Sequence, residues 1–118
     1  MNKEIFEGRK IMISQPMKGK TNEEIKKERD IYVKAITDLG GEVVDTVFAS
    51  SPEEAQNKPL WYLSKAIEAM STVDAMVFMP GWESARGCMI EHIIASSYGV
   101  PTLEIPDIET WRKEHEAD

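Results

Sequence analysis

Four short apolar stretches alternate with segments of helical periodicity, and this alternation restricts the fold more than any other feature of the sequence. The apolar stretches are residues 10–14, 42–48, 73–79 and 100–105. Helical spacing of apolar residues runs from 21 or 22 to 39, in 60–71, in 86–98 and from 107 or 108 to 116. Strands that alternate with helices form parallel sheets with right-handed crossovers. The sequence therefore predicts a three-layer α/β sandwich in which about four parallel strands, in the order 2-1-3-4, carry helices on both faces.

The size and charge of the chain narrow its functional class. The 118 residues predict a single domain, 1–118, and the content of 42% apolar and 30% charged residues is typical of a globular protein. The net charge of −7 argues against binding to a nucleic acid polymer, whose phosphate backbone attracts basic proteins. A small nucleotide is compatible with this charge, because a single site can be locally positive on an acidic protein.

Neither a metal centre nor a membrane segment is expected. Cys88 is the single cysteine, which excludes an internal disulfide, and two histidines are too few to complete a zinc cluster with it. We therefore expect no metal and no cofactor. No segment approaches the roughly 20 apolar residues that span a bilayer, and residues 1–9 are charged rather than signal-like. The expected location is the cytoplasm.

Two loops should meet at the carboxyl edge of the sheet, where open α/β sheets bind ligands. They are residues 15–20 and 80–86, which follow the first and third expected strands. After the second loop, Gly87 has no Cβ and so lets a ligand approach the main chain. Glu91 lies one helical turn later, where its carboxylate can act as a nucleophile or base. Alternatively, Glu91 is acidic only because the helix dipole favours negative charge near a helix start.

Some residues near these loops allow two interpretations. Lys18 precedes a helix N-terminus and is either a contact for a ligand phosphate or a solvated surface lysine. Trp82 lies in the second loop and either stacks on a base or packs within the protein. Cys88 is expected to be a small buried residue rather than a nucleophile. The third helix should turn one face toward the sheet, and the residues expected there are Met89 or Ile90, Ile93, Ile94 and Ser97.

Four segments together resemble a small domain family of bacteria and phages within the nucleoside 2-deoxyribosyltransferase-like superfamily. The segments are residues 11–17 (IMISQPM), 59–65 (PLWYLSK), 73–83 and 85–92 (ARGCMIEH). Among the relatives of this family are the 2'-deoxynucleoside 5'-phosphate N-hydrolases. The resemblance covers about residues 9–105 and implies a flavodoxin-like, or Rossmann-like, α/β fold.

The resemblance also implies an activity. Enzymes of the superfamily cleave the N-glycosidic bond of a deoxynucleoside or deoxynucleotide through a glutamate that forms a covalent glycosyl ester. Glu91 falls at the position of that nucleophile, and Lys18 falls at a phosphate contact of the nucleotide hydrolases. The sugar-binding first loop corresponds to Ser14, Gln15, Pro16 and Met17. In the second loop, the residues themselves make Arg86 and Gly87 candidates for ligand binding, and the resemblance adds Ser84. Arg86 is either an anion contact or a surface partner of Glu83.

Relatives assemble as dimers or larger, so a homodimer or larger homo-oligomer is expected. The aromatic residues that are candidates for the contact are Trp61, Tyr62 and Trp111.

Three positions depart from the enzymes of the superfamily. Ala66 stands where they carry an aspartate that assists the leaving base. Ala85 replaces a serine or aspartate, with Ser84 one position away, and Gln15 replaces a glycine. The sequence thus leaves three hypotheses: an N-glycosidase or deoxyribosyltransferase, a nucleotide-binding module that has lost turnover, and an interaction protein whose crevice is an oligomer contact.

Overall fold

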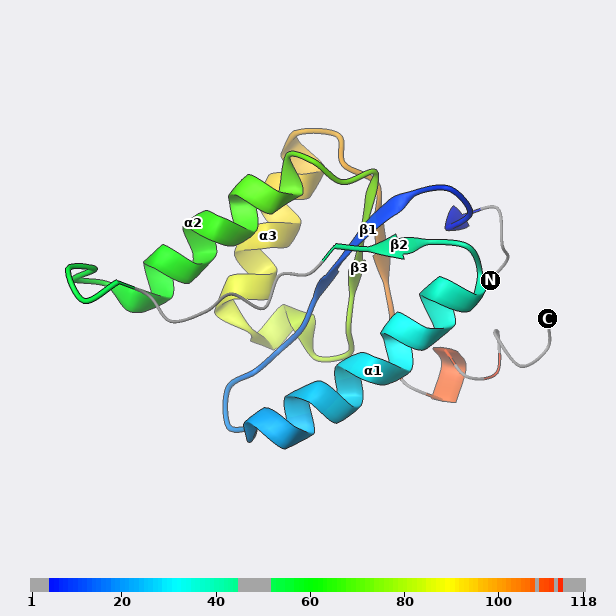
Figure 1. The fold of residues 1–118 in the computed structure, drawn as a ribbon, viewed down its shortest axis with the longest axis horizontal. Coiled ribbons are helices and arrows are strands. Elements are labelled where there is room, and N and C mark those ends of the chain that lie inside the picture. The colour runs from blue at the N-terminus through cyan, green and yellow to red at the C-terminus, as the bar shows by residue number, and fades with distance from the viewer. Residues whose placement is uncertain (1–4, 45–51, 108, 112, 114–118) are drawn as a thin grey trace.

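Four parallel strands form the centre of the fold, in the order β2-β1-β3-β4 (Figure 1). A computed structural model describes residues 5–44, 52–107, 109–111 and 113 of the chain. The strands are β1 (Lys10–Ser14), β2 (Glu42–Val43), β3 (Ala75–Phe78) and β4 (Thr102–Glu104). The strand order and the parallel pairing confirm the prediction, and the fold is flavodoxin-like.

The sheet lies between two helical layers, with α1 (Asn22–Asp38) on one face and α2 (Lys58–Met70) and α3 (Arg86–Ser97) on the other (Figure 1). Successive strand residues face opposite layers, because the side chains of a strand alternate. The cluster on the α1 face combines Ile11, Ile13, Ala75 and Val77 with Tyr32 and Ile36. The cluster on the other face combines Met12, Met76 and Phe78 with Ala66, Met70 and Ala95.

Local signals in the sequence fix the helix ends. Thr21 is the N-cap of α1 and forms a capping box with Glu24, so that two main-chain N–H groups gain partners. Asn57 caps α2 by accepting from the N–H of Leu60 at 3.0 Å. Gly40 follows α1 with φ of 88°, a conformation that glycine adopts without strain. These residues explain why the predicted helices begin and end within two residues of the observed bounds.

β1 has its predicted bounds, whereas β3 and β4 are shorter than predicted. β3 begins at Ala75, because the carboxylate of Asp74 turns back to accept from the N–H of Lys10 at 2.8 Å. β2 pairs over Glu42–Val43, and residues 45–48 of the predicted strand lie outside the described residues. Of the predicted terminal helix, residues 109–111 are helical, while 108, 112 and 114–116 also lie outside that part of the chain.

The face of α3 that meets the sheet was predicted only in part: Ile94 packs against the apolar cluster as expected, but other residues of the predicted face do not. Met89 and Ile93 are 44% and 57% exposed, and Ser97 is exposed as well. The buried residues are instead Cys88 and Ala95, which lie seven positions apart and so on one side of the helix. Small residues let the helix approach the sheet closely. Apolar residues occur on more than one side of α3, so periodicity alone could not choose between the sides.

Trp111 belongs to the core. Its ring lies 6.2 Å from that of Phe6 and 5.2 Å from that of Tyr32, and it is 2% exposed. The prediction that Trp111 is an oligomer contact was therefore wrong. Within the described part of the chain, every helix is too short or too polar to cross a bilayer.

Candidate functional site

The end of β1 and the second turn of α3 meet at the carboxyl edge of the sheet. The hydroxyl of Ser14 donates to Oε1 of Glu91 at 2.7 Å. Ser14 ends β1 and, two residues after Met12, faces the layer that holds α3. The two predicted loops are neighbours, because Met79 N–H donates to the carbonyl of Ser14 at 3.0 Å. The structure thus brings together Glu91 and one residue of the predicted first loop.

Burial dominates the electrostatics of Glu91. Removal from water raises the pKa of this carboxyl group, and the hydrogen bond from Ser14 lowers it by less, so the pKa lies above its ordinary value. The helix dipole contributes little, because α3 begins at Arg86 and Glu91 lies beyond its first turn. A carboxylate of raised pKa is a stronger base and nucleophile than an exposed glutamate.

Cys88 is the third member of this buried cluster. Burial raises the pKa of its thiol, a hydrogen bond with Ser14 lowers it, and the charge of Glu91 raises it again. The thiol is therefore held in its protonated form, which is not nucleophilic. Cys88 is buried, as predicted, and packs at the start of α3. Ser14 consequently connects a neutral thiol to the carboxyl group of Glu91.

The other residues of the first loop turn away from Glu91. Gln15 faces α1, where its Nε2 donates to the carbonyl of Ile25 at 2.8 Å. The Oε1 atom of Gln15 is buried, and no described residue donates a hydrogen bond to it. Pro16 is half-buried beside the second loop, since a Cβ at Gly81 would lie 3.8 Å from its Cγ. Met17 and Lys18 are exposed, so the surface interpretation of Lys18 accounts for its position.

The second loop leads into an open helix start. Ser84, Arg86 and Gly87 are exposed there, and a Cβ built at Gly87 would meet no atom within 4 Å. Ala85 is the N-cap of α3 and supplies no side-chain hydrogen bond. The first N–H groups of a helix lack partners within the helix. Those of α3 have no side-chain cap from Ala85, and the helix carries Cys88 and Glu91 of the buried cluster.

Trp82 packs within the protein rather than presenting a free face. Its ring stacks on His92 at 4.3 Å with an interplanar angle of 20°, and Phe78 lies 5.5 Å away. His92 also contacts the last residue of β4, because its Nε2 lies 2.6 Å from Oε1 of Glu104. Sequence reasoning missed this pair. The available signal was the position of Glu104 at the end of an expected strand, and hence at the ligand-binding edge.

Ala66 is a core residue of the fold. Its side chain is 8% exposed and packs in the apolar cluster with Met12, Met76 and Phe78. A carboxylate at this position would lie against that cluster.

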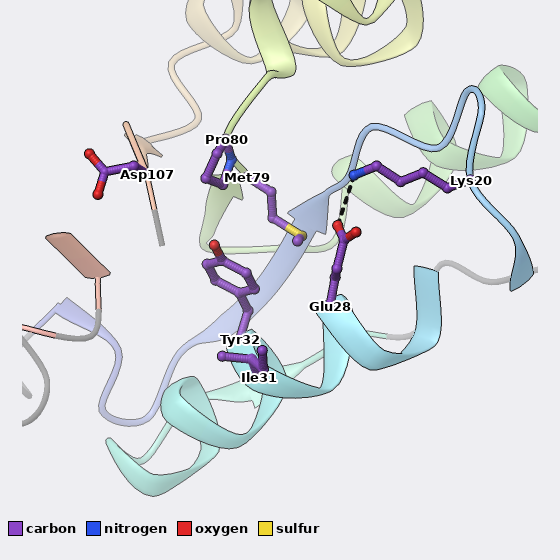
Figure 2. Close-up of a pocket in the computed structure, with 7 residues that line it drawn as sticks. All are labelled: Lys20, Glu28, Ile31, Tyr32, Met79, Pro80 and Asp107. Carbon is purple, nitrogen blue, oxygen red and sulfur yellow. Dashed lines mark hydrogen bonds and ion pairs between the residues drawn. The ribbon is translucent and has the colours of Figure 1, made fainter. Parts of the chain in front are cut away.

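A hollow of about 480 Å³ lies at the carboxyl edge of the sheet, on the face that α1 covers (Figure 2). No predicted site residue lines it, which separates it from the cluster around Glu91. Its lining consists of Lys20, Glu28, Ile31, Tyr32, Met79, Pro80 and Asp107. Among the described residues, no three His, Cys, Asp or Glu side chains are grouped so as to hold a metal ion.

Comparison with known proteins identifies the family but not an activity. Residues 9–104 match a family described as "Domain of unknown function (DUF4406)". Neither a curated protein nor a solved structure matches the chain. The matched residues run from the start of β1 to the end of β4 and so include all four strands of the sheet and the cluster around Glu91. The chain therefore belongs to the DUF4406 family.

Proposed function

We propose that this protein cleaves the N-glycosidic bond of a deoxynucleoside or deoxynucleotide, with Glu91 as the nucleophile. The observation that supports the proposal most is the 2.7 Å hydrogen bond from Ser14 to Oε1 of Glu91 at the carboxyl edge of the sheet. Because this hydrogen bond engages Oε1, the other oxygen of the carboxylate, Oε2, remains for attack on a sugar. The resemblance to the nucleoside 2-deoxyribosyltransferase-like superfamily assigns the same role to Glu91.

The proposed reaction has two steps. In the first, Oε2 of Glu91 attacks the anomeric carbon, the bond from that carbon to the base nitrogen breaks, and its electron pair leaves with the base. The base takes its proton from water, because Ala66 supplies no acid. In the second step, water attacks the anomeric carbon of the glycosyl ester, the bond from that carbon to Oε2 breaks and releases the carboxylate of Glu91, and the proton that the water loses neutralises the hydroxide left by the first step. A second base in place of water would give transfer instead of hydrolysis.

Electrostatics support this role. The raised pKa of Glu91 makes its carboxylate more basic than that of an exposed glutamate. The hydroxyl of Ser14 fixes one carboxylate oxygen, which reduces the number of orientations that attack requires. The open start of α3, with unpaired N–H groups around Gly87, is suited to the hydroxyl or phosphate oxygens of a ligand.

The test is a panel of deoxynucleosides and their 5'-phosphates, assayed for release of the free base. We expect release by the wild type and by Glu83→Gln, a change at an exposed loop residue, and none by Glu91→Gln. Mass spectrometry of the quenched wild type should show a glycosyl adduct on Glu91. Absence of base release from every member of the panel would reject the proposal.

A binding module without turnover is the second candidate, and the buried position of Ala66 favours it. Without an acid, departure of the base is slow. Calorimetry with the same panel distinguishes the two candidates, because the module would bind a nucleotide tightly and release no base.

We also propose that the protein forms a homodimer through α2 and α3. These adjacent helices carry most of the large apolar side chains that are exposed in the described part of the chain, and such residues gather at protein interfaces. We call the α2–α3 patch those that share a helix face by their spacing, which are Leu60 with Ile67 and Met89 with Ile93. The helices of the patch carry nearly balanced charge, so two copies can meet there without strong repulsion.

A further inference from the structure

The hollow on the α1 face has the form of a second ligand site. Its volume of about 480 Å³ is within the range of small-molecule sites, roughly 300–1,000 Å³. It lies between the middle of α1 and the segment that follows β3, as Figure 2 shows. Ser14 and Glu91 belong to the opposite face of the edge, which α3 covers. The two places are therefore distinct.

The floor of the hollow is apolar and firmly packed. Tyr32 and Met79 form it, and both are 2% exposed. Behind Tyr32 lies the ring of Trp111, with 5.2 Å between the ring centroids. Ile31 and Pro80 add further apolar surface to the walls. A ligand that fills this space needs an apolar ring or chain to match the floor.

Among the described residues that line the hollow, negative charges outnumber positive ones. Lys20 Nζ lies 2.8 Å from Oε2 of Glu28, and Figure 2 draws this ion pair across one end of the hollow. No described residue forms a hydrogen bond to the other oxygen of Glu28, Oε1. Asp107 adds a second carboxylate, whose pKa is lowered because the main chain and hydroxyl of Thr110 donate hydrogen bonds to it. Its side chain points outward, so it contributes charge rather than a contact.

We propose that this hollow binds a small organic cation, namely a primary amine on an apolar ring or chain. The ammonium group donates to Oε1 of Glu28, and the apolar part lies on Tyr32, Met79 and Pro80. The carboxylates of Glu28 and Asp107 outnumber the ammonium group of Lys20, so a cation is favoured over an anion at the rim. The net charge of −7 adds a long-range attraction of the same sign.

The test compares three probes of similar shape by calorimetry and by amide chemical shifts. They are 2-phenylethylamine, which is a cation, 2-phenylethanol, which is neutral, and 3-phenylpropionate, which is an anion. We expect the amine to bind most tightly and to shift the amides of α1 and of residues 79 and 80. Equal binding of the alcohol, or shifts confined to other elements, would overturn the proposal.

Two substitutions at the rim should act in opposite directions. Glu28→Gln removes the acceptor charge and frees Lys20, so the amine should bind about ten-fold more weakly. Lys20→Met removes the competing ammonium, and the amine should then bind a few-fold more tightly. Glu23→Gln makes the same charge change at an exposed position of α1 and should alter binding less than two-fold. A change of the same sign in both rim variants would contradict the proposed role of Glu28.

Two further variants separate this site from the catalytic proposal and from folding effects. Ile31→Trp should fill the hollow and abolish amine binding while the circular dichroism spectrum is retained, since Ile31 is half-buried at its wall. Glu91→Gln should leave amine binding unchanged, whether or not it abolishes base release. Retained binding in Ile31→Trp would place the amine elsewhere and reject the site.

Discussion

Ser14 and Glu91 are 77 positions apart in the chain, yet the hydroxyl of Ser14 donates a 2.7 Å hydrogen bond to the carboxyl group of Glu91. One partner is the last residue of β1, and the other lies in the second turn of α3. The contact therefore joins the sheet to a helix of the outer layer at the edge where ligands bind. The position of the carboxyl group depends on both elements.

Replacement of Ser14 by alanine should raise the pKa of Glu91 further, because the hydrogen bond from Ser14 lowers it. Because the pKa of Glu91 is raised on folding, protonation of this group stabilises the folded protein. This stabilisation is fully present below the ordinary pKa of a glutamate and is lost as the pH rises through the raised pKa. Carboxyl NMR can follow the titration of Glu91 without any assay of activity. In the assay, the acidic limb of the pH–rate profile should move to higher pH, with about ten-fold lower kcat/KM.

Ser64→Ala is the matched control for that change. Its hydroxyl bonds to the carbonyl of Trp61 on the exposed side of α2, far from the cluster. The control should leave the titration of Glu91 and the rate unchanged. An unaltered pKa of Glu91 in Ser14→Ala would show that the hydrogen bond has no electrostatic effect in solution.

Ala85 leaves α3 without a side-chain cap, so a hydroxyl at this position should stabilise the protein. Ala85→Thr is expected to increase the free energy of unfolding by about 1 kcal/mol, since the threonine oxygen can accept from the first turn. For a domain of this size, the melting temperature should rise by about 4 °C. Ala85→Val has the same shape without the oxygen. If both variants melt at the same temperature, the gain does not come from capping.

Ala66→Asp should destabilise the fold rather than restore an acid to the site. The new carboxylate would enter the apolar cluster formed with Met12, Met76 and Phe78. Burial of an unpaired polar group there should lower the free energy of unfolding by about 2–4 kcal/mol, as measured by urea denaturation. Ser64→Asp, at an exposed position of the same helix, should change it by less than about 0.5 kcal/mol. Faster base release by Ala66→Asp would show that residue 66 reaches the ligand after all.

The contact between His92 and Glu104 should make the free energy of unfolding depend on pH in the acidic range. Burial alone raises the pKa of Glu104, but hydrogen bonds from His92 and Thr102 outweigh it, so the pKa lies below the ordinary value of 4.5. The resulting stabilisation is present above pH 4.5 and is lost as pH falls through the lowered pKa. Because the pair is partly exposed, the effect is at most about 0.5 kcal/mol.

Thermal melts between pH 3 and 6 test this dependence. Glu104→Gln should melt below the wild type at pH 6, and the two curves should converge as the pH falls. Glu83→Gln, at an exposed loop position, should follow the wild type at every pH. A constant difference between Glu104→Gln and the wild type would mean that the charge of Glu104 has no part in the effect.

A charge within the α2–α3 patch should separate the proposed dimer. Ile93 is 57% exposed, so Ile93→Glu should leave the fold intact and weaken dimerisation at least about 100-fold, because each copy contributes one buried charge. Sedimentation velocity over a range of concentrations measures the change. Met17→Glu adds the same charge at a residue that is 45% exposed outside the patch and should not alter association. A wild type that sediments as a monomer throughout would end the dimer proposal.

Much of the fold follows from sequence because the relevant signals are local. The capping box of Thr21, the glycine after α1 and the apolar run of β3 each determine their own element. The orientation of α3 depends on a competition between surfaces, and only packing decides it. Cys88 and Ala95 are weaker hydrophobic signals than Met89 and Ile93, yet their small size suits contact with the sheet. The burial of Trp111 likewise depends on Phe6 and Tyr32, which lie far from it in sequence.

The candidate site was predictable only in part. The proximity of the first loop to Glu91 followed from the strand order, because loops after neighbouring parallel strands meet at one edge. The strand order did not predict that Ser14 faces α3 while Gln15 faces α1, since these directions depend on where β1 ends. The partner of His92 was also missed, because the end of β4 marks Glu104 as lying at the ligand-binding edge but does not say which side chain it contacts.

Ser14 and Gln15 are consecutive residues, yet one contacts α3 and the other contacts α1. Insertion of a single amino acid within β1 would exchange their directions, sending a hydroxyl toward Ile25 and a bulky carboxamide toward Glu91. The sheet would then lose both its hydrogen bond to α3 and its hydrogen bond to α1. A shift of this kind in one short strand would thus disable the molecule even though every side chain needed for its chemistry were still encoded.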